Sequence, residues 1–176
     1  MHLIYKITDE DIGKEFIGLN NPITRLGARG IVIGDDGKIA LFNKINKNEF
    51  KLPGGGIEDA ELPSIAFKRE VLEETGCIVE IVEELGIIEE CISYNNFKQT
   101  SYVFVGKVIE DTKKLNVTQK EQDEGAKLLW TTPENVLELI KSCFDILKSS
   151  DYDSVYASKF MVKRDSTILE YYINKK

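Results

Sequence analysis

The pattern of hydrophobic and polar residues predicts a chain built largely of short strands. β-Branched and aromatic residues concentrate in runs at about 2–7, 29–33, 38–45, 78–92, 99–109 and 126–131. Within 99–109, Tyr102, Phe104 and Val108 alternate with intervening residues, as the side chains on one face of a strand do. The segment Gly34-Asp35-Asp36-Gly37 separates two of the runs and predicts a hairpin turn.

Helical signals lie between these runs. Residues 63–75 are the clearest candidate, because Pro63 is tolerated in a first helical turn and Gly76 supplies a stop. Thr8 is expected to cap a short helix that follows the first strand. A further helix is predicted at about 133–149, where it opens on a proline.

The remaining segments complete an α/β chain. The run Leu52-Pro-Gly-Gly-Gly56 is expected to be a loop, because glycine allows backbone angles that regular elements do not use. The last segment has a mixed pattern that favours a helix over 165–173. Strands alternating with helices predict an α/β/α sandwich around a mixed β-sheet. The length predicts a single domain over 1–176, with a core at about 25–150 and additions at both ends.

Composition narrows the function. The formal net charge is −7 and no run of Lys or Arg interrupts it, which argues against a nucleic-acid partner. Cys77, Cys91 and Cys143 form neither a CxxC pair nor a disulfide framework, which favours a reducing, cytoplasmic setting. His2 is the only histidine, so a histidine-based triad is excluded. No apolar run is long enough to cross a membrane.

Candidate chemistry is concentrated between Gly55 and Cys77. On a helix, Glu70 and Glu74 lie one turn apart on the same face, with Glu73 close by. Carboxylates at this spacing repel one another, whereas a hard cation such as Mg²⁺ binds oxygen ligands and reverses the sign of that interaction. The segment therefore predicts a site for a divalent cation.

Neighbouring residues fit the same chemistry. The planar guanidinium of Arg69 can bind a carboxylate such as Glu61 with two hydrogen bonds and orient it. The glycines Gly54, Gly55 and Gly56 allow the main chain to approach a metal or a phosphate closely. Arg29 precedes the strands of the core, where its side chain could reach a substrate phosphate or form a surface salt bridge.

This stretch resembles the Nudix box, G-x5-E-x7-R-E-U-x-E-E-x-G-U, where U is a bulky aliphatic residue. The fixed positions are all matched, by Gly55, Glu61, Arg69, Glu70, Glu73, Glu74 and Gly76. Val71 fills the first U position, whereas Cys77 is a smaller residue at the last. Seven fixed residues at fixed spacing are a far more specific signal than a lone glycine motif.

The resemblance implies roles for the matching residues. Glu70 and Glu74 would be the main ligands of Mg²⁺, or of Mn²⁺ as the alternative, and Glu73 would be a further ligand or help to activate water. The carbonyl of Gly55 would also bind the metal. Glu61 would be an accessory carboxylate, and Arg69 would orient the glutamates.

The general base would come from the box or from Glu121, Asp123 or Glu124, which lie in a polar stretch further along the chain. A plain surface loop explains that stretch equally well.

The resemblance predicts a metal-dependent hydrolase that cleaves a phosphoanhydride bond in a nucleoside diphosphate derivative. Removal of unwanted (d)NTPs is the first specific expectation, followed by ADP-ribose and nucleotide sugars. A homodimer would be in keeping with the family. The alternative is a catalytically silent module of the same fold that binds nucleotides or regulates another protein.

Overall fold

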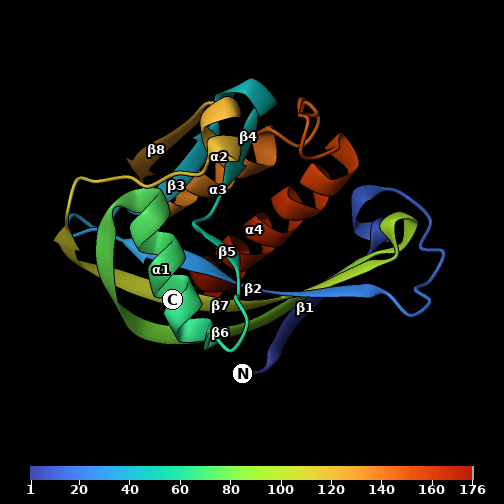
Figure 1. The fold of residues 1–176 in the computed structure, drawn as a ribbon, viewed down its shortest axis with the longest axis horizontal. Coiled ribbons are helices and arrows are strands. Elements are labelled where there is room, and N and C mark those ends of the chain that lie inside the picture. The colour runs from blue at the N-terminus through green and yellow to red at the C-terminus, as the bar shows by residue number, and fades with distance from the viewer. Residues whose placement is uncertain (176) are drawn as a thin grey trace.

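A computed structural model describes residues 1–175 and shows a mixed β-sheet with helices packed against it (Figure 1). The strands are β1 (Leu3–Ile7), β2 (Ile23–Ile33), β3 (Ile39–Lys44), β4 (Glu49–Lys51), β5 (Gly54–Gly56), β6 (Cys77–Ile92), β7 (Phe97–Asp111) and β8 (Ala126–Thr131). The α-helices are α1 (Pro63–Thr75), α2 (Gln119–Asp123), α3 (Pro133–Ser142) and α4 (Val155–Lys175). Short 3-10 turns lie at Asp9–Ile12, Ile45–Lys47 and Ser93–Asn95.

The sheet combines parallel and antiparallel pairs. Its strand order is β1-β6-β7-β2-β3-β4, with β5 paired to β2 and β8 paired to β3. Strands β6 and β7 form a long antiparallel hairpin, whereas β2 runs parallel to β7 and β1 runs parallel to β6. Helix α1, which carries Glu70, Glu73 and Glu74, is the next element after β5. The pairing of β5 with β2 therefore helps to position the start of that helix.

Side chains alternate between the two faces of the sheet. In β7, Val103 and Val105 pack into the core shared with α3 and α4. Phe104 points to the opposite face, where its ring stacks on Phe67 of α1 with 5.3 Å between the ring centroids. Figure 1 shows α1 apart from the long diagonal helix α4. Helices therefore cover both faces, which confirms the predicted α/β/α arrangement around a mixed sheet.

Most predicted elements are present. Helix α1 has the predicted limits, and Gly76 after it adopts the left-handed conformation (φ 71°) that glycine favours. Strand β2 begins at Ile23, earlier than predicted, because its amino-terminal half pairs with β7. The helix expected after Thr8 is a single 3-10 turn. No helix within residues 1–175 is long and apolar enough to cross a membrane.

The prediction that the glycine run is entirely loop was wrong. Gly54–Gly56 form β5 and pair antiparallel with Gly27, Ala28 and Arg29 of β2. A β-carbon on Gly54 would lie 2.4 Å from the carbonyl oxygen of Ala28, so only glycine permits this approach. The glycines shape a strand here rather than a free loop.

The carboxy-terminal helices also differ from prediction. Helix α3 ends at Ser142, where the chain turns and buries Cys143, rather than near 149. Helix α4 begins ten residues earlier than position 165, at Val155. Its first turns carry a weak helical pattern, but Phe160 and Val162 are buried in the core beneath α4. Packing against the sheet, which local sequence does not reveal, therefore extends this helix.

Candidate active site

A pocket of about 490 Å³ opens between the glycine strand, α1, α2 and α4. It is lined by residues from six strands and three helices or their flanks: Arg25, Arg29, Lys44, Lys51, Gly54, Gly55, Gly56, Glu70, Glu74, Glu90, Ile92, Asn95, Phe97, Gln99, Thr118, Lys120, Glu121, Asp153, Ala157, Met161 and Arg164. A more open hollow of about 520 Å³ over α3 contains none of the predicted site residues. The pocket beside the glycine strand is therefore the candidate active site.

Gly55 and Glu70 meet where the glycine strand faces α1. A β-carbon on Gly55 would lie 2.4 Å from the carboxylate carbon and both oxygens of Glu70. A side chain at position 55 would therefore displace the carboxylate. The absence of a side chain brings the main chain of β5 against an acidic group, which is the arrangement expected at a metal or phosphate site.

Arg69 binds several acceptors around the start of the motif. Its Nε and Nη2 atoms each donate to a different oxygen of Glu61, at 2.9 Å, and Nη2 also donates to the Gly56 carbonyl. Its Nη1 atom donates to Glu70 at 2.9 Å and lies 3.5 Å from Glu73. The hydrogen bond from Arg69 lowers the pKa of Glu61. Arg69 thus joins Glu61, Glu70 and the carbonyl of Gly56 through one guanidinium group.

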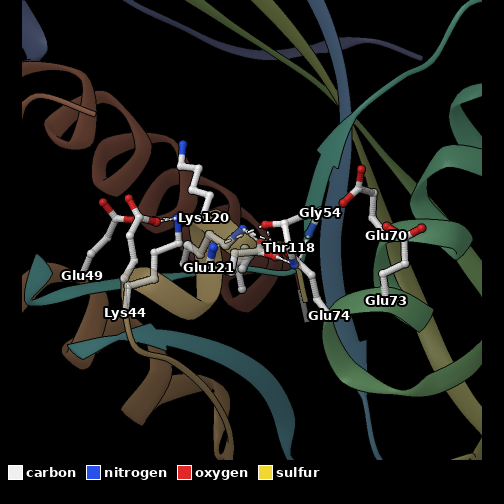
Figure 2. Close-up of polar contacts among 12 residues, drawn as sticks. Lys44, Glu49, Gly54, Glu70, Glu73, Glu74, Thr118, Lys120 and Glu121 are labelled. Atoms are coloured by element: carbon white, nitrogen blue, oxygen red, sulfur yellow. Dashed lines mark hydrogen bonds and ion pairs between the residues drawn. The ribbon is translucent and has the colours of Figure 1, made fainter. Parts of the chain in front are cut away.

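Glu74 is buried and faces away from Arg69. Its Oε1 atom accepts from Lys51 Nζ at 2.6 Å, and its Oε2 atom accepts from the Gly54 amide at 2.8 Å. Figure 2 shows Glu74 pointing toward Glu121 while Glu70 and Glu73 lie to the side. Burial raises the pKa of Glu74 to about 7, and the charge of Glu121 adds to this effect while Lys51 opposes it.

Glu121 reaches the same pocket from a distant part of the chain. Thr118 caps α2 and donates to Glu121 through both its amide and its hydroxyl, at 2.9 Å. The ammonium group of Lys51 lies 3.5 Å from Glu121. Burial raises the pKa of Glu121, but the charge of Lys51 and these hydrogen bonds outweigh it and lower the pKa to about 2. Glu74 and Glu121 therefore form a coupled pair in which the pKa of Glu74 is raised and that of Glu121 is lowered.

Of the three residues considered as a base outside the motif, Glu121 alone lines the pocket. Glu124 is buried against Lys44, at 2.6 Å, and accepts from Ser150. Asp123 is exposed and accepts from Tyr152 and Gln119. The stretch that was expected to be a loop is the short helix α2, whose cap turns Glu121 inward.

The predicted metal ligands are not gathered in one cluster. Within residues 1–175, no group of three or more acidic, cysteine or histidine side chains is close enough to hold an ion. Glu70 and Glu73 contact Arg69, whereas Glu74 contacts Lys51, because each carboxylate takes a cationic partner. The donor set nevertheless fits a hard divalent cation, since carboxylate oxygens and the main chain of Gly55 border the same pocket.

The predicted substrate ligand Arg29 is also in the pocket. It is buried, and its Nε atom donates to Ser101 Oγ at 3.2 Å. Burial, together with the charge of Arg164, lowers the pKa of Arg29 to about 10. The side chain remains cationic at neutral pH, so it is suited to an electron-rich oxygen of a bound ligand. A purely surface role for Arg29 is excluded by its burial.

Several pocket residues were not predicted. Lys51 precedes the glycine run and contributes the cation that bridges Glu74 and Glu121. Lys120 and Arg164 add further cations, and Gln99 adds an amide. A positively charged residue close to a glycine run is a sequence signal from which Lys51 could have been predicted as a pocket residue. Nothing local marks Gln99 or Arg164, because β7 and α4 reach the pocket only through the tertiary fold.

Comparison with protein families matches residues 23–148 to the NUDIX domain. A MutT-like protein of Streptomyces ambofaciens is 28% identical over 125 residues, which cover 71% of this chain and 75% of that protein. Nudix hydrolase 25 of Arabidopsis thaliana is 30% identical over 128 residues, which cover 61% of this chain and 71% of that protein.

Solved structures share the fold at low sequence identity. A NUDIX hydrolase from Nitrosomonas europaea aligns with a TM-score of 0.62 and 18% identity, covering 87% of this chain and 90% of that one. The MutT protein from Methanosarcina mazei Go1 aligns with a TM-score of 0.54 and 20% identity, covering 89% and 99%. A UDP-X diphosphatase aligns with a TM-score of 0.54 and 18% identity, covering 90% and 66%.

Proposed function

This chain belongs to the Nudix family of pyrophosphohydrolases, and from that premise we propose that it cleaves a phosphoanhydride bond in a nucleoside diphosphate derivative with the help of a divalent cation. The observation that carries the proposal is the meeting of Glu70 and Glu74 from the motif with Glu121 in one pocket, beside the glycine strand. Three carboxylates and three glycines at one opening match a metal-assisted attack on a phosphate.

Mg²⁺ is the proposed cation, with Mn²⁺ as the alternative. Glu70, Glu74 and the carbonyl of Gly55 would hold it, with Glu73 as a further ligand. When bound, the cation neutralises phosphate oxygens and lowers the pKa of an attacking water. Because Lys51 contacts both Glu74 and Glu121, its ammonium group balances their charge before a substrate and cation enter.

The other pocket residues have separable roles in the proposed reaction. The glycine strand binds phosphate oxygens, and Arg29 binds an electron-rich oxygen of the substrate deeper in the pocket. Arg69 keeps Glu61 and Glu70 oriented through its forked hydrogen bonds. Glu121 is the proposed base outside the motif, because it lines the pocket whereas Asp123 and Glu124 do not. A carboxylate must be ionised to accept the proton of water.

The proposed substrates are small nucleotides, with (d)NTPs first and with ADP-ribose and nucleotide sugars next. The proposed setting is the cytoplasm, in keeping with the buried, unpaired thiols of Cys77, Cys91 and Cys143. We also propose that residues outside 23–148 belong to the same domain, because β1 pairs with β6 and α4 shares the core of the sheet.

The test is phosphate or pyrophosphate release with Mg²⁺ from (d)NTPs, 8-oxo-dGTP, ADP-ribose, nucleotide sugars and diadenosine polyphosphates. Glu74→Gln removes a proposed ligand, and Glu80→Gln on the exposed side of β6 is the matched control. Turnover that EDTA and Glu74→Gln both abolish, and that Glu80→Gln retains, supports the hydrolase. Nucleotide binding without any turnover would instead support the silent module.

A further inference from the structure

A buried polar cluster forms one wall of the pocket. It contains Arg29 from β2, Glu90 from β6, Gln99 and Ser101 from β7, and Arg164 and Asp165 from α4. Each of these residues is at most 7% exposed. Helix α4 lies outside residues 23–148, so the NUDIX match does not account for the part it contributes.

The charges in this wall are balanced. Arg164 donates from Nε to Asp165 at 2.7 Å and from Nη1 to both oxygens of Glu90, at 3.3 and 3.4 Å. The second oxygen of Asp165 accepts from the Leu52 amide at 2.9 Å. Two arginines therefore face two carboxylates, and the wall offers no net charge to attract a further phosphate.

Glu90 fixes the orientation of the Gln99 amide. The Nε2 atom of Gln99 donates to Glu90 at 2.9 Å and to Ser101 at 3.3 Å. A carboxylate that already binds Arg164 has only acceptor atoms, so the NH₂ end of Gln99 must face it. The carbonyl oxygen of Gln99 is left as a hydrogen-bond acceptor for whatever enters the pocket.

The two guanidinium groups of the wall keep donors for a ligand. Within residues 1–175, the Nη2 atom of Arg164 is buried and has no hydrogen-bond partner. Arg29 uses its Nε atom to bind Ser101, which leaves its terminal nitrogens for a ligand. A buried donor without a partner destabilises the protein, so a ligand that supplies an acceptor here is favoured.

Apolar side chains border the same wall. Ile92, Phe97, Ala157 and Met161 line the pocket together with the cluster. Aromatic and thioether groups pack favourably on flat heterocycles, whereas they offer nothing to a phosphate. The pocket therefore combines an apolar lining with a fixed acceptor and two donors.

We propose that this wall reads the edge of a nucleobase on which a carbonyl lies beside a ring N–H, as in guanine and uracil. The carbonyl accepts from the Arg29 and Arg164 guanidinium groups, and the ring N–H donates to the carbonyl oxygen of Gln99. Adenine and cytosine present an amino group beside a ring acceptor, which is the reverse order. Gln99 cannot turn to suit them while Glu90 holds its NH₂ end. The inference rests on the proposed function, because it takes this pocket as the nucleotide site.

The first test compares four substrates that differ only in the base. Wild-type protein with Mg²⁺ hydrolyses GDP-, UDP-, ADP- and CDP-linked forms of one sugar, and kcat/KM is measured for each. A hydrogen bond to a charged donor predicts at least about tenfold higher kcat/KM for the guanine and uracil compounds. Equal kcat/KM for all four would overturn the inference and leave the proposed hydrolase intact.

The second test releases the Gln99 amide. In Glu90→Gln, position 90 can donate or accept, so Gln99 is free to turn, and the base preference is expected to fall to less than about threefold. Glu89→Gln is the matched control on the same strand, since Glu89 pairs with Lys98 outside the pocket. A merely structural role for Glu90 predicts a lower melting temperature with an unchanged preference, which would contradict the proposal.

Two further measurements distinguish failure of the inference from failure of the proposed function or of a variant to fold. If Glu90→Gln does not fold, Gln99→Met removes the acceptor at similar volume and is expected to abolish the same preference. If no compound is hydrolysed, the proposed function fails, and calorimetry with GMP, UMP, AMP and CMP decides the inference alone. Tighter binding of GMP and UMP supports it, and equal binding of the four overturns it.

Discussion

Two groups of carboxylates in this protein have the same chemistry and opposite surroundings. The motif group, Glu61, Glu70 and Glu73, surrounds a single cation, Arg69, whose side chain is 25% exposed. The buried ion cluster consists of Lys44, Lys47, Glu49 and Glu124, with Asp153 and Lys120 at its edge. In that cluster the side chains of Lys44, Lys47, Glu49 and Glu124 are at most 4% exposed.

This difference in surroundings determines how available each group of carboxylates is to a ligand. Three carboxylates around one arginine leave an excess of negative charge at a partly open position, which attracts a divalent cation. In the buried ion cluster, Lys47 lies 2.7 Å from Glu49 and Lys44 lies 2.6 Å from Glu124, so lysines already supply the counter-charge. The balance of charge therefore separates a binding group from a structural one more clearly than the number of carboxylates does.

Removing one carboxylate from the motif group should give the largest effect on activity. Glu70→Gln deletes a proposed metal ligand, and loss of several kcal/mol of charge stabilisation predicts roughly a thousandfold lower kcat/KM. The free energy of unfolding should change by less than about 1 kcal/mol, because the ion pair with Arg69 is partly exposed. Steady-state kinetics and urea denaturation check both parts. Near-normal turnover would show that Glu70 is not a ligand.

Removing one lysine from the buried ion cluster should act on stability instead. Lys47→Met leaves Glu49 buried beside fewer cations, which predicts a loss of about 3–5 kcal/mol in the free energy of unfolding. Urea denaturation measures this loss. Lys38→Met breaks an exposed pair with Asp36 and is the matched control, whose denaturation midpoint should stay close to that of the wild type.

A paired change sharpens that result. In Lys47→Met combined with Glu49→Leu, no unpaired charge remains at position 49, and most of the lost stability should return. If the double variant is as unstable as Lys47→Met alone, the cost lies in packing rather than in the unpaired carboxylate.

Arg69→Lys should have a smaller effect on activity than loss of a carboxylate. Lysine keeps the charge but cannot donate to two oxygens of Glu61 and to the Gly56 carbonyl at once. Loss of such an orienting group typically costs about 10–100-fold in activity or metal affinity. Initial rates across a Mg²⁺ titration would show the change, and unaltered rates and metal dependence would mean that the fork does not orient the ligands.

The smallest effect should be an acid dependence of the buried ion cluster. Burial raises the pKa of Glu124 and Asp153, but their lysine partners and hydrogen bonds outweigh it, so both folded pKa values lie below the usual 4.5 and 3.8. The unfolded chain therefore takes up these protons first as the pH falls. The contribution of these two carboxylates to stability should be constant above about pH 5 and decline below their unfolded pKa values.

Thermal denaturation in metal-free buffer between pH 3 and 7 would follow this decline. Asp153→Asn removes one of the two carboxylates and should reduce the slope below pH 4.5. An identical slope in the variant would assign the acid sensitivity to other groups.

The sequence predicted features that depend on neighbouring residues and missed contacts between segments that lie far apart in the chain. The limits of α1 follow from Pro63 and Gly76, and every fixed residue of the motif lies in one short stretch. Lys51 bridging Glu74 and Glu121 could not be predicted, because that contact depends on how the end of β4, α1 and α2 come together. The three candidate bases were indistinguishable in sequence, since only the Thr118 cap decides which one turns inward.

The pairing of β1 has a consequence for how the protein is made. Leu3 is synthesised well before its partner across the sheet, Ile87 of β6. Tyr171, late in α4, hydrogen-bonds His2. During translation the edge of β1 therefore stays unpaired until these later segments emerge. Such non-local pairing slows folding and exposes strand edges to other nascent chains. A ribosome-associated chaperone that covers an amino-terminal strand would act on this interval.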